Sequence, residues 1–195
     1  MPKVGMEPIR KRALISAAIE AIHERGSLEI TMGQIARRAG VSPGLAHHYF
    51  GGKDQLIVAT MRHLLSEFRA SALEHIRATR HPRERVSGII HASFSDGQFS
   101  GETVSAWLVF YVRAQESQMA RRLLQIYSRR LQSNLVDALR PMLGKEAVRV
   151  AEGIGALIDG LYIRCALKEG PTDAARAIAL VEDYVDLQVR IAGSR

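Results

Sequence analysis

One short stretch of the chain holds residue types that suit contact with DNA. Gly44 allows the backbone to approach a duplex closely, Leu45 can touch a thymine methyl group, and His47 can offer a ring nitrogen to a base edge. Tyr49 and Lys53 can bind phosphates, which position a protein on DNA without reading its sequence. We therefore predict a binding surface rather than a catalytic centre. Its expected DNA-binding residues are Thr31, Gly33, Ser42, Pro43, Gly44, Leu45, His47, His48, Tyr49 and Lys53.

Two short helices joined by a tight turn are predicted to carry these side chains. Thr31 begins a capping box at the start of the first helix. Gly40 permits the turn, and Ser42 followed by Pro43 is a favourable start for the second helix. In a helix-turn-helix, the second helix enters the major groove, so residues 31–50 predict this motif.

The overall charge favours a polyanionic partner. The formal net charge is +7 and the pI is near 10, and each Lys or Arg on a phosphate releases a condensed counterion. Two alternatives stay open, because a helix pair with a glycine turn is common in all-α proteins and Arg37 and Arg38 can form a solvated face. Four further arginines lie far from the pair along the chain, namely Arg121, Arg122, Arg129 and Arg130.

A second group of residues suits the binding of an organic cation. Trp107 and Tyr111 are four residues apart and share one helix face. A quaternary ammonium cannot donate hydrogen bonds and is held by aromatic faces and a carboxylate, for which Asp159 is the candidate. Ordinary core packing of these rings, and pairing of Asp159 with Arg164, are the alternatives. The expected ligand-binding residues are Trp107, Phe110, Tyr111, Tyr127, Asp159 and Tyr162.

Apolar residues recur at helical spacing along the remaining sequence, so we predict an all-α protein of about nine helices. The first helix ends near Gly26, where glycine suits a left-handed cap. We expect residues 1–68 to form the DNA-binding domain and residues 69–195 a ligand-binding and dimerisation domain. The later helices are expected at Lys53–Ala78, Arg83–Ser95, Glu102–Glu116, Gln118–Leu139, Lys145–Leu167 and Thr172–Ile191, with breaks at Gly97, Gly101, Pro141, Gly144, Gly170 and Pro171.

Several classes of protein are disfavoured by the sequence. No run approaches the roughly 18 apolar residues of a membrane span, and the N-terminus lacks a secretory signal, so we expect a cytoplasmic protein. The single cysteine, Cys165, is expected to be a buried small hydrophobe. His47 and His48 are adjacent, about 100° apart on a helix, and cannot share a metal as an i, i+4 pair can. We expect no enzyme, metal or cofactor; a helical adaptor that binds only protein remains an alternative.

The N-terminal third resembles the TetR family of bacterial repressors. The resemblance implies a homodimer with a three-helix DNA-binding unit and a larger helical domain that holds an inducer. It also implies that the last two long helices form the dimer interface. The alternative is that the apolar residues of these helices are buried within the core of a monomer. The matching residues are Thr31, Ile35, Ala36, Ala39, Gly40, Val41, Ser42, Gly44, Tyr49, Phe50, Lys53 and Leu56, with Pro43 and Ala46 as variations.

A narrower resemblance is to the choline-responsive repressors of this family. It implies control of the genes for choline uptake and synthesis of the osmoprotectant glycine betaine, with choline as the inducer that releases operator DNA. A regulator that answers another cationic or hydrophobic ligand, such as a regulator of multidrug efflux, is the alternative. This resemblance rests on residues 1–3, 5–6, 9–10, 20–22, 34–42, 48–50, 59–62, 128–131, 133–135 and 157–161.

Overall fold

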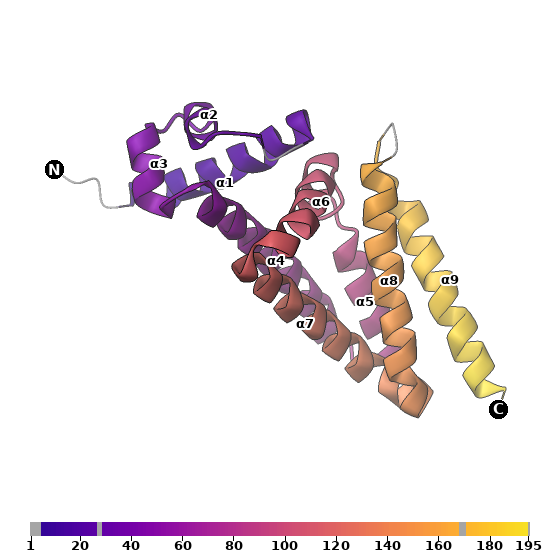
Figure 1. Ribbon diagram of the computed structural model, residues 1–195. Coiled ribbons are helices and arrows are strands. Elements are labelled where there is room, and N and C mark those ends of the chain that lie inside the picture. Colours follow the sequence, from indigo (N-terminus) through magenta and orange to yellow (C-terminus); the bar gives the residue numbers. More distant parts are fainter. Residues whose placement is uncertain (1–4, 27–28, 168–170, 195) are drawn as a thin grey trace.

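The computed structural model describes residues 5–26, 29–167 and 171–194, and every regular element in these ranges is helical (Figure 1). The predicted all-α class is therefore confirmed. The nine α-helices and one short 3-10 helix of the described residues are α1 (Met6–Arg25), α2 (Met32–Arg38), α3 (Pro43–Phe50), α4 (Lys53–Ala78), α5 (Pro82–Ser93), α6 (Gly101–Glu116), α7 (Gln118–Leu143), η1 (Gly144–Glu146), α8 (Ala147–Ala166) and α9 (Ala174–Gly193).

The predicted end of α7 was wrong. We expected the helix to stop at Leu139 before Pro141, but it continues through the proline to Leu143. A proline so close to the helix end removes only one intrahelical hydrogen bond, and Leu143 is buried in the main core. The start of α8 also differs, because Lys145 lies in η1 and the α-helix begins at Ala147. The break predicted at Gly170 lies outside the described residues.

Two hydrophobic cores meet along α4. The smaller core joins α1, α2 and α3 and includes Leu56 and Ile57 of α4. The larger core begins with Val58 and Met61 of the same helix and extends through α5 to α9. Because α4 contributes to both cores, it links α1–α3 mechanically to the rest of the molecule; the domain division that we propose at residue 68 falls within it.

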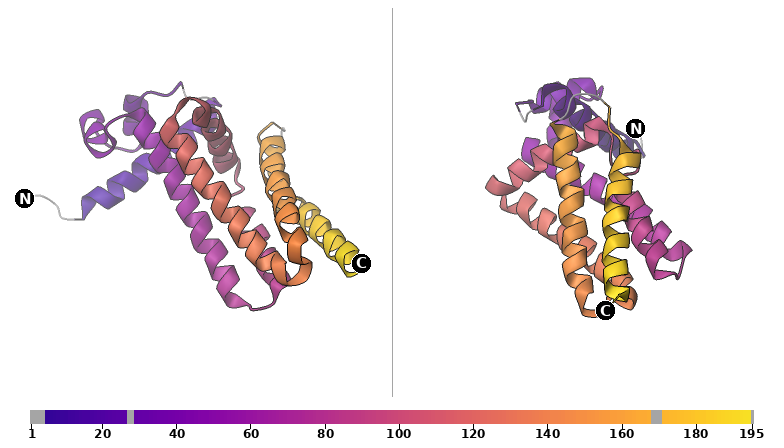
Figure 2. Two further views of the ribbon diagram at one scale, coloured as in Figure 1. Left: turned by 60° about the horizontal axis from the view of Figure 1, so that its bottom comes forward. Right: turned by 90° about the vertical axis from the view of Figure 1, so that its right-hand side faces the viewer.

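The last two helices lie side by side at the edge of the molecule, away from α1–α3 (Figures 1 and 2). Their inner faces are fully buried at Ile154, Val181 and Val185. Other apolar side chains on the same helices are exposed, with 47% of each accessible at Val148, Leu180 and Leu187, so one face of this helix pair remains uncovered. Further exposed apolar residues of α8, α9 and the turn after α8 are Ile163, Leu167 and Ile191.

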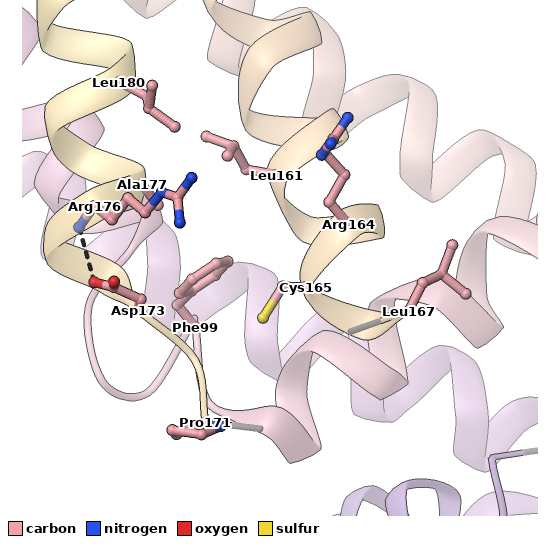
Figure 3. Close-up of a pocket in the computed structure, with 10 residues that line it drawn as sticks. All are labelled: Phe99, Leu161, Arg164, Cys165, Leu167, Pro171, Asp173, Arg176, Ala177 and Leu180. Carbon is pink, nitrogen blue, oxygen red and sulfur yellow. Dashed lines mark hydrogen bonds between the residues drawn. The ribbon is translucent and has the colours of Figure 1, made fainter. Parts of the chain in front are cut away.

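A cavity of about 500 Å³ lies between the end of α8 and the start of α9 (Figure 3). Cys165 lines it and is half-buried, packed against the larger core, so the prediction of a buried small hydrophobe was wrong in its degree of burial. Its position next to the last residue of α8, beside this cavity, explains the exposure. In the part of the chain that the structure describes, no helix is long and apolar enough to cross a membrane.

Candidate DNA-reading surface and cation site

Local capping fixes the helix pair formed by α2 and α3. The Thr31 hydroxyl accepts a hydrogen bond from the Gln34 amide at 3.2 Å, and the Thr31 amide donates to Gln34 Oε1 at 2.9 Å, which completes the predicted capping box. Gly40 has φ of +64° in the turn, a conformation that glycine adopts without strain. The Ser42 side chain caps α3 by accepting from the Leu45 amide at 3.3 Å. These contacts hold the second helix across the first.

The outer face of α3 carries most of the predicted base-reading residues. Ala46 is fully buried against the smaller core, whereas Leu45 and Tyr49 are half-buried beside it. Leu45 therefore divides its side chain between core packing and the surface. The predicted contact residues of this helix and its cap that are exposed are Ser42, Pro43, Gly44, His47 and His48.

Hydrogen bonding selects the tautomer of His47. Its Nδ1 lies 3.3 Å from the Gly51 carbonyl oxygen, and a carbonyl can only accept, so Nδ1 donates. In the neutral ring, Nε2 is then an acceptor. An acceptor at this exposed position suits the amino groups that adenine and cytosine present in the major groove.

The predicted phosphate contacts surround the start of α4 and the start of α2. Lys53 is the first residue of α4, and the preceding Gly52 supplies no side-chain cap; a helix N-terminus of this kind is the environment that the predicted phosphate contact requires. Thr31 is exposed and Gly33 is half-buried at the start of α2. Tyr49 lies beneath the ammonium of Lys11, with 5.7 Å between Nζ and the ring centroid.

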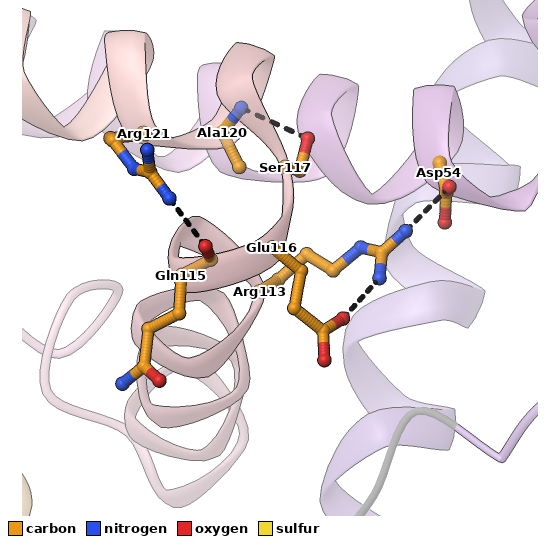
Figure 4. A network of polar contacts seen from close by, with 7 residues as sticks. All are labelled: Asp54, Arg113, Gln115, Glu116, Ser117, Ala120 and Arg121. Atoms are coloured by element: carbon orange, nitrogen blue, oxygen red, sulfur yellow. Dashed lines mark hydrogen bonds and ion pairs between the residues drawn. The ribbon is translucent and has the colours of Figure 1, made fainter.

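An ion pair beside Lys53 was missed by the sequence reasoning. Arg113 at the end of α6 binds the Asp54 carboxylate at 2.6 Å and Glu116 at 2.7 Å (Figure 4). The partial charge of the helix N-terminus favours Asp54, but an unpaired carboxylate there would repel a phosphate. Arg113 shares its single positive charge between Asp54 and Glu116, and it ties α6 to the start of α4. No sequence signal indicated this pair, because the two residues are 59 positions apart.

The arginine pair on α2 is divided between two roles. Arg38 bridges back to α1, with contacts of 2.5 Å to Glu24 and 3.8 Å to Glu20. Arg37 is exposed. Arg38 thus fixes α2 against α1, and the solvated-face interpretation fits Arg37.

The predicted aromatic residues meet in the larger core. Trp107 has its ring centroid 5.7 Å from Tyr111 and 5.1 Å from Tyr127. Phe110 and Tyr162 lie at 6.3 and 6.2 Å from the same indole, both nearly perpendicular to it. Side chains from α6, α7 and α8 therefore surround one tryptophan, which is 3% exposed.

A partly buried carboxylate adjoins these rings. The Tyr111 hydroxyl donates to Asp159 Oδ1 at 2.8 Å. Burial raises the pKa of Asp159, and the Tyr111 hydrogen bond opposes part of that rise. Burial, followed by the nearby Asp159 charge, raises the pKa values of Tyr111 and Tyr127. The site thus combines aromatic rings with one partly desolvated carboxylate, the two features that the predicted cation site requires.

Tyr162 is tied to the backbone through its hydroxyl. That hydroxyl lies 2.5 Å from the Ser93 carbonyl oxygen and 3.0 Å from that of Gln98, so it donates to backbone. Its ring stays part of the cluster, nearly perpendicular to the Trp107 indole. Trp107 Nε1, by contrast, is buried and makes no hydrogen bond within the described residues, and an oxygen of a bound ligand could satisfy it.

Three phenylalanines extend the aromatic group beyond the predicted set. Phe94 and Phe99 contact the Tyr162 ring at 6.0 and 5.1 Å. Phe68 of α4 meets the Tyr127 ring edge-on at 5.7 Å. Only the long-range fold brings them there, since they lie on other elements. Among the described residues, no group of three or more His, Cys, Asp or Glu side chains could hold a metal ion.

Known proteins resemble this chain over nearly its whole length. Residues 14–60 match the family of bacterial regulatory proteins of the tetR family, and residues 82–190 match the C-terminal part of the BetI-type transcriptional repressor. The HTH-type transcriptional regulator BetI of Brucella anthropi is 60% identical over 190 residues, which cover 97% of this chain and 98% of that protein. The BetI regulator of Rhizobium meliloti is 54% identical over 194 residues, 99% of this chain and 96% of that protein. These relatives are regulators of transcription and not enzymes.

Solved structures with low sequence identity share the fold. A TetR transcription regulator from Haloarcula marismortui superposes with a TM-score of 0.81 at 19% identity, covering 92% of this chain and 98% of that one. A transcriptional regulator from Saccharomonospora viridis, solved in complex with choline, gives 0.75 at 17% identity, with coverage of 90% and 95%.

Proposed function

Since the chain belongs to the TetR family and carries the C-terminal domain of its BetI-type transcriptional repressors, we propose that it represses the genes for choline uptake and glycine betaine synthesis and that choline releases it from operator DNA. The observation that carries the choline assignment is the contact of the Trp107 and Tyr111 rings beside the partly buried carboxylate of Asp159.

The chemistry of this cluster matches a trimethylated cation. Choline's ammonium group has no N–H to donate, so it needs aromatic faces and a counter-charge rather than acceptors. Trp107 and Tyr111 supply the faces, and Asp159 supplies the charge. The buried indole N–H of Trp107 is a donor without a partner in the described structure, which suits the hydroxyl oxygen at the other end of choline.

Binding must separate rings that now touch. The Trp107 indole contacts Tyr111 on its own helix and Tyr127 on α7, so a trimethylammonium group can enter only if α6 or α7 moves. A ligand shifts a conformational equilibrium only when it binds one state better than the other. The closed ring cluster would be the DNA-binding state, and the spread cluster the choline-bound state.

The same helix reaches the DNA-reading unit at two points. Ser105 of α6 hydrogen-bonds His23 of α1 at 3.0 Å, and Arg113 holds Asp54 beside Lys53. Displacement of α6 would therefore move α1 and the start of α4 together. The coupling should be on the order of 1–3 kcal/mol and reciprocal, so operator DNA must weaken choline binding.

Pairing of two chains would make the switch effective. We propose that the exposed apolar residues of α8 and α9, such as Val148, Leu180 and Leu187, meet a second copy around a two-fold axis. Two reading helices then match half-sites roughly 34 Å apart, and a change of this spacing abolishes simultaneous binding.

A mobility-shift assay with duplex DNA from upstream of the protein's own gene tests the proposal. We expect a complex that choline dissolves and ethanolamine leaves intact, because ethanolamine has the same charge and hydroxyl but no methyl groups. Release by ethanolamine, or no response to choline, would contradict the assignment of the inducer. Equal release by tetraphenylphosphonium would favour a regulator of multidrug efflux.

A further inference from the structure

A second cavity, of about 510 Å³, opens between α4 and α7 on the outside of the larger core. Its floor is apolar and well buried, with Phe68 7%, Ala72 2% and Leu131 6% exposed. Tyr127 also lines it. The volume lies in the range of about 300–1,000 Å³ typical of sites for small organic molecules.

Three arginines surround this apolar floor. Arg62, Arg69 and Arg130 all line the cavity and are exposed. None of the three makes an ion pair with any residue in the described ranges. Other arginines do pair with carboxylates, namely Arg38, Arg83, Arg85, Arg113 and Arg149. Guanidinium groups remain charged at every accessible pH. The cavity mouth therefore repels a quaternary ammonium and attracts an anion.

We propose that this groove, defined by the lining residues of α4 and α7, binds a single-chain carboxylate amphiphile such as a medium-chain fatty acid. The carboxylate would pair with the arginines, which present donors in a geometry that matches its two oxygens. The hydrocarbon chain would lie along Phe68 and Leu131. A free fatty acid has both required parts in one molecule, and a flat anionic bilayer cannot enter a recessed floor.

Tyr127 separates the groove from the cation site. Its ring contacts Phe68 on the groove side at 5.7 Å and Trp107 on the other side at 5.1 Å. A chain that presses on Tyr127 must alter the surroundings of Trp107, which is the single tryptophan of the sequence. The groove thus forms a second effector site with a built-in fluorescent reporter, and this inference does not rest on the choline proposal.

Titration of the full chain with octanoate and decanoate, followed by tryptophan fluorescence and calorimetry, tests the site. Each buried methylene should tighten binding about fourfold, so decanoate should bind about 15-fold more tightly than octanoate. Nonyl glucoside, which has the same nine-carbon tail and a neutral head group, should bind about tenfold more weakly than decanoate. Equal affinity for decanoate and nonyl glucoside would overturn the proposal.

Paired variants separate the groove arginines from overall charge. The double variant Arg69→Gln/Arg130→Gln should lose about tenfold in decanoate affinity and keep its affinity for nonyl glucoside. The control Arg80→Gln/Arg190→Gln removes two exposed charges outside the groove and should change decanoate affinity less than twofold. If both variants lose the same decanoate affinity, the groove is not a fatty-acid site. A parallel titration with anionic lipid vesicles gives a second check, because binding of the vesicles without binding of decanoate would also exclude a fatty-acid site.

Discussion

The helix pair of α2 and α3 and the aromatic cluster are built on opposite principles. Every cap of the pair joins residues three positions apart, as at Thr31 with Gln34 and Ser42 with Leu45. In the aromatic cluster, Tyr111 and Asp159 are 48 positions apart and meet only because α6 packs on α8. The exposed positions of α3, such as Gly44 and His47, can therefore change with little effect on the fold, whereas the members of the aromatic cluster cannot.

The helix pair and the aromatic cluster also differ in the solvent exposure of their side chains. His47 on the reading helix is exposed and packs on nothing that the core needs. Trp107 is almost completely buried and contacts four other rings. A site made of core residues couples ligand binding to stability, and this coupling is what a conformational switch requires.

Replacement of Trp107 by alanine should have the largest effect. Trp107→Ala leaves a cavity in the larger core and should lower the free energy of unfolding by about 3–5 kcal/mol. Urea denaturation followed by far-ultraviolet circular dichroism measures this change. His47→Ala on the exposed face should stay within about 0.5 kcal/mol of the parent. A small effect of Trp107→Ala would show that the cluster is loosely packed, and Trp107→Phe would then be the better test of choline binding.

The contrast also explains how far the sequence could predict the molecule. The helix pair was predictable because its signals, such as Gly40 and Ser42, act within a few residues. The shared face of Trp107 and Tyr111 followed from helical spacing. The partners of the Tyr162 hydroxyl did not, since they are carbonyls at the end of α5 and in the segment that follows it. The Arg113 pair with Asp54 likewise depends on how α6 crosses α4.

Loss of the Asp159 carboxylate should have the next largest effect. Asp159→Asn removes the counter-charge while keeping the size of the side chain, and choline affinity should fall by about 30-fold, since truncating one partner of a desolvated charge pair removes about 2 kcal/mol and the carboxylate is partly buried. Calorimetric titration with choline measures the loss. Retention of the parental affinity would remove Asp159 from the site.

The pH dependence of the same variant gives an independent check. Burial raises the folded-state pKa of Asp159 above the ordinary value of 3.8. The protonated Asp159 side chain therefore contributes its full stability below pH 3.8, and this contribution is lost as the pH rises through the folded-state pKa. The unliganded parent should therefore lose stability relative to Asp159→Asn across this window. Choline binding should strengthen over the same window, because it needs the ionised carboxylate. A constant stability difference between the two proteins would contradict the burial argument.

Removal of a cap should have a smaller effect, confined to the reading unit. Ser42→Ala leaves the Leu45 amide without its side-chain acceptor and should lower the free energy of unfolding by about 1 kcal/mol. Ser128→Ala, at an exposed position of α7, is the matched control. Operator affinity should fall with the cap while choline affinity stays the same, so an equal loss of both would show that the two regions do not behave separately.

The smallest expected effect concerns a single phosphate contact. Lys53→Ala should weaken binding to all DNA sequences alike and should reduce the slope of log affinity against log salt by about one unit, because one fewer counterion is released. Fluorescence anisotropy with operator and unrelated duplexes over a series of salt concentrations measures both quantities.

Lys145→Ala provides the charge-matched control for Lys53→Ala. Lys145 is exposed in η1, at the far end of the molecule from α3 (Figure 1), so its loss lowers the net charge equally without touching the reading surface. The control should keep the parental slope, since screening limits the reach of a distant charge to about 10 Å at 0.1 M salt. If both variants flatten the slope equally, the DNA responds to overall charge, and the start of α4 is not a phosphate site.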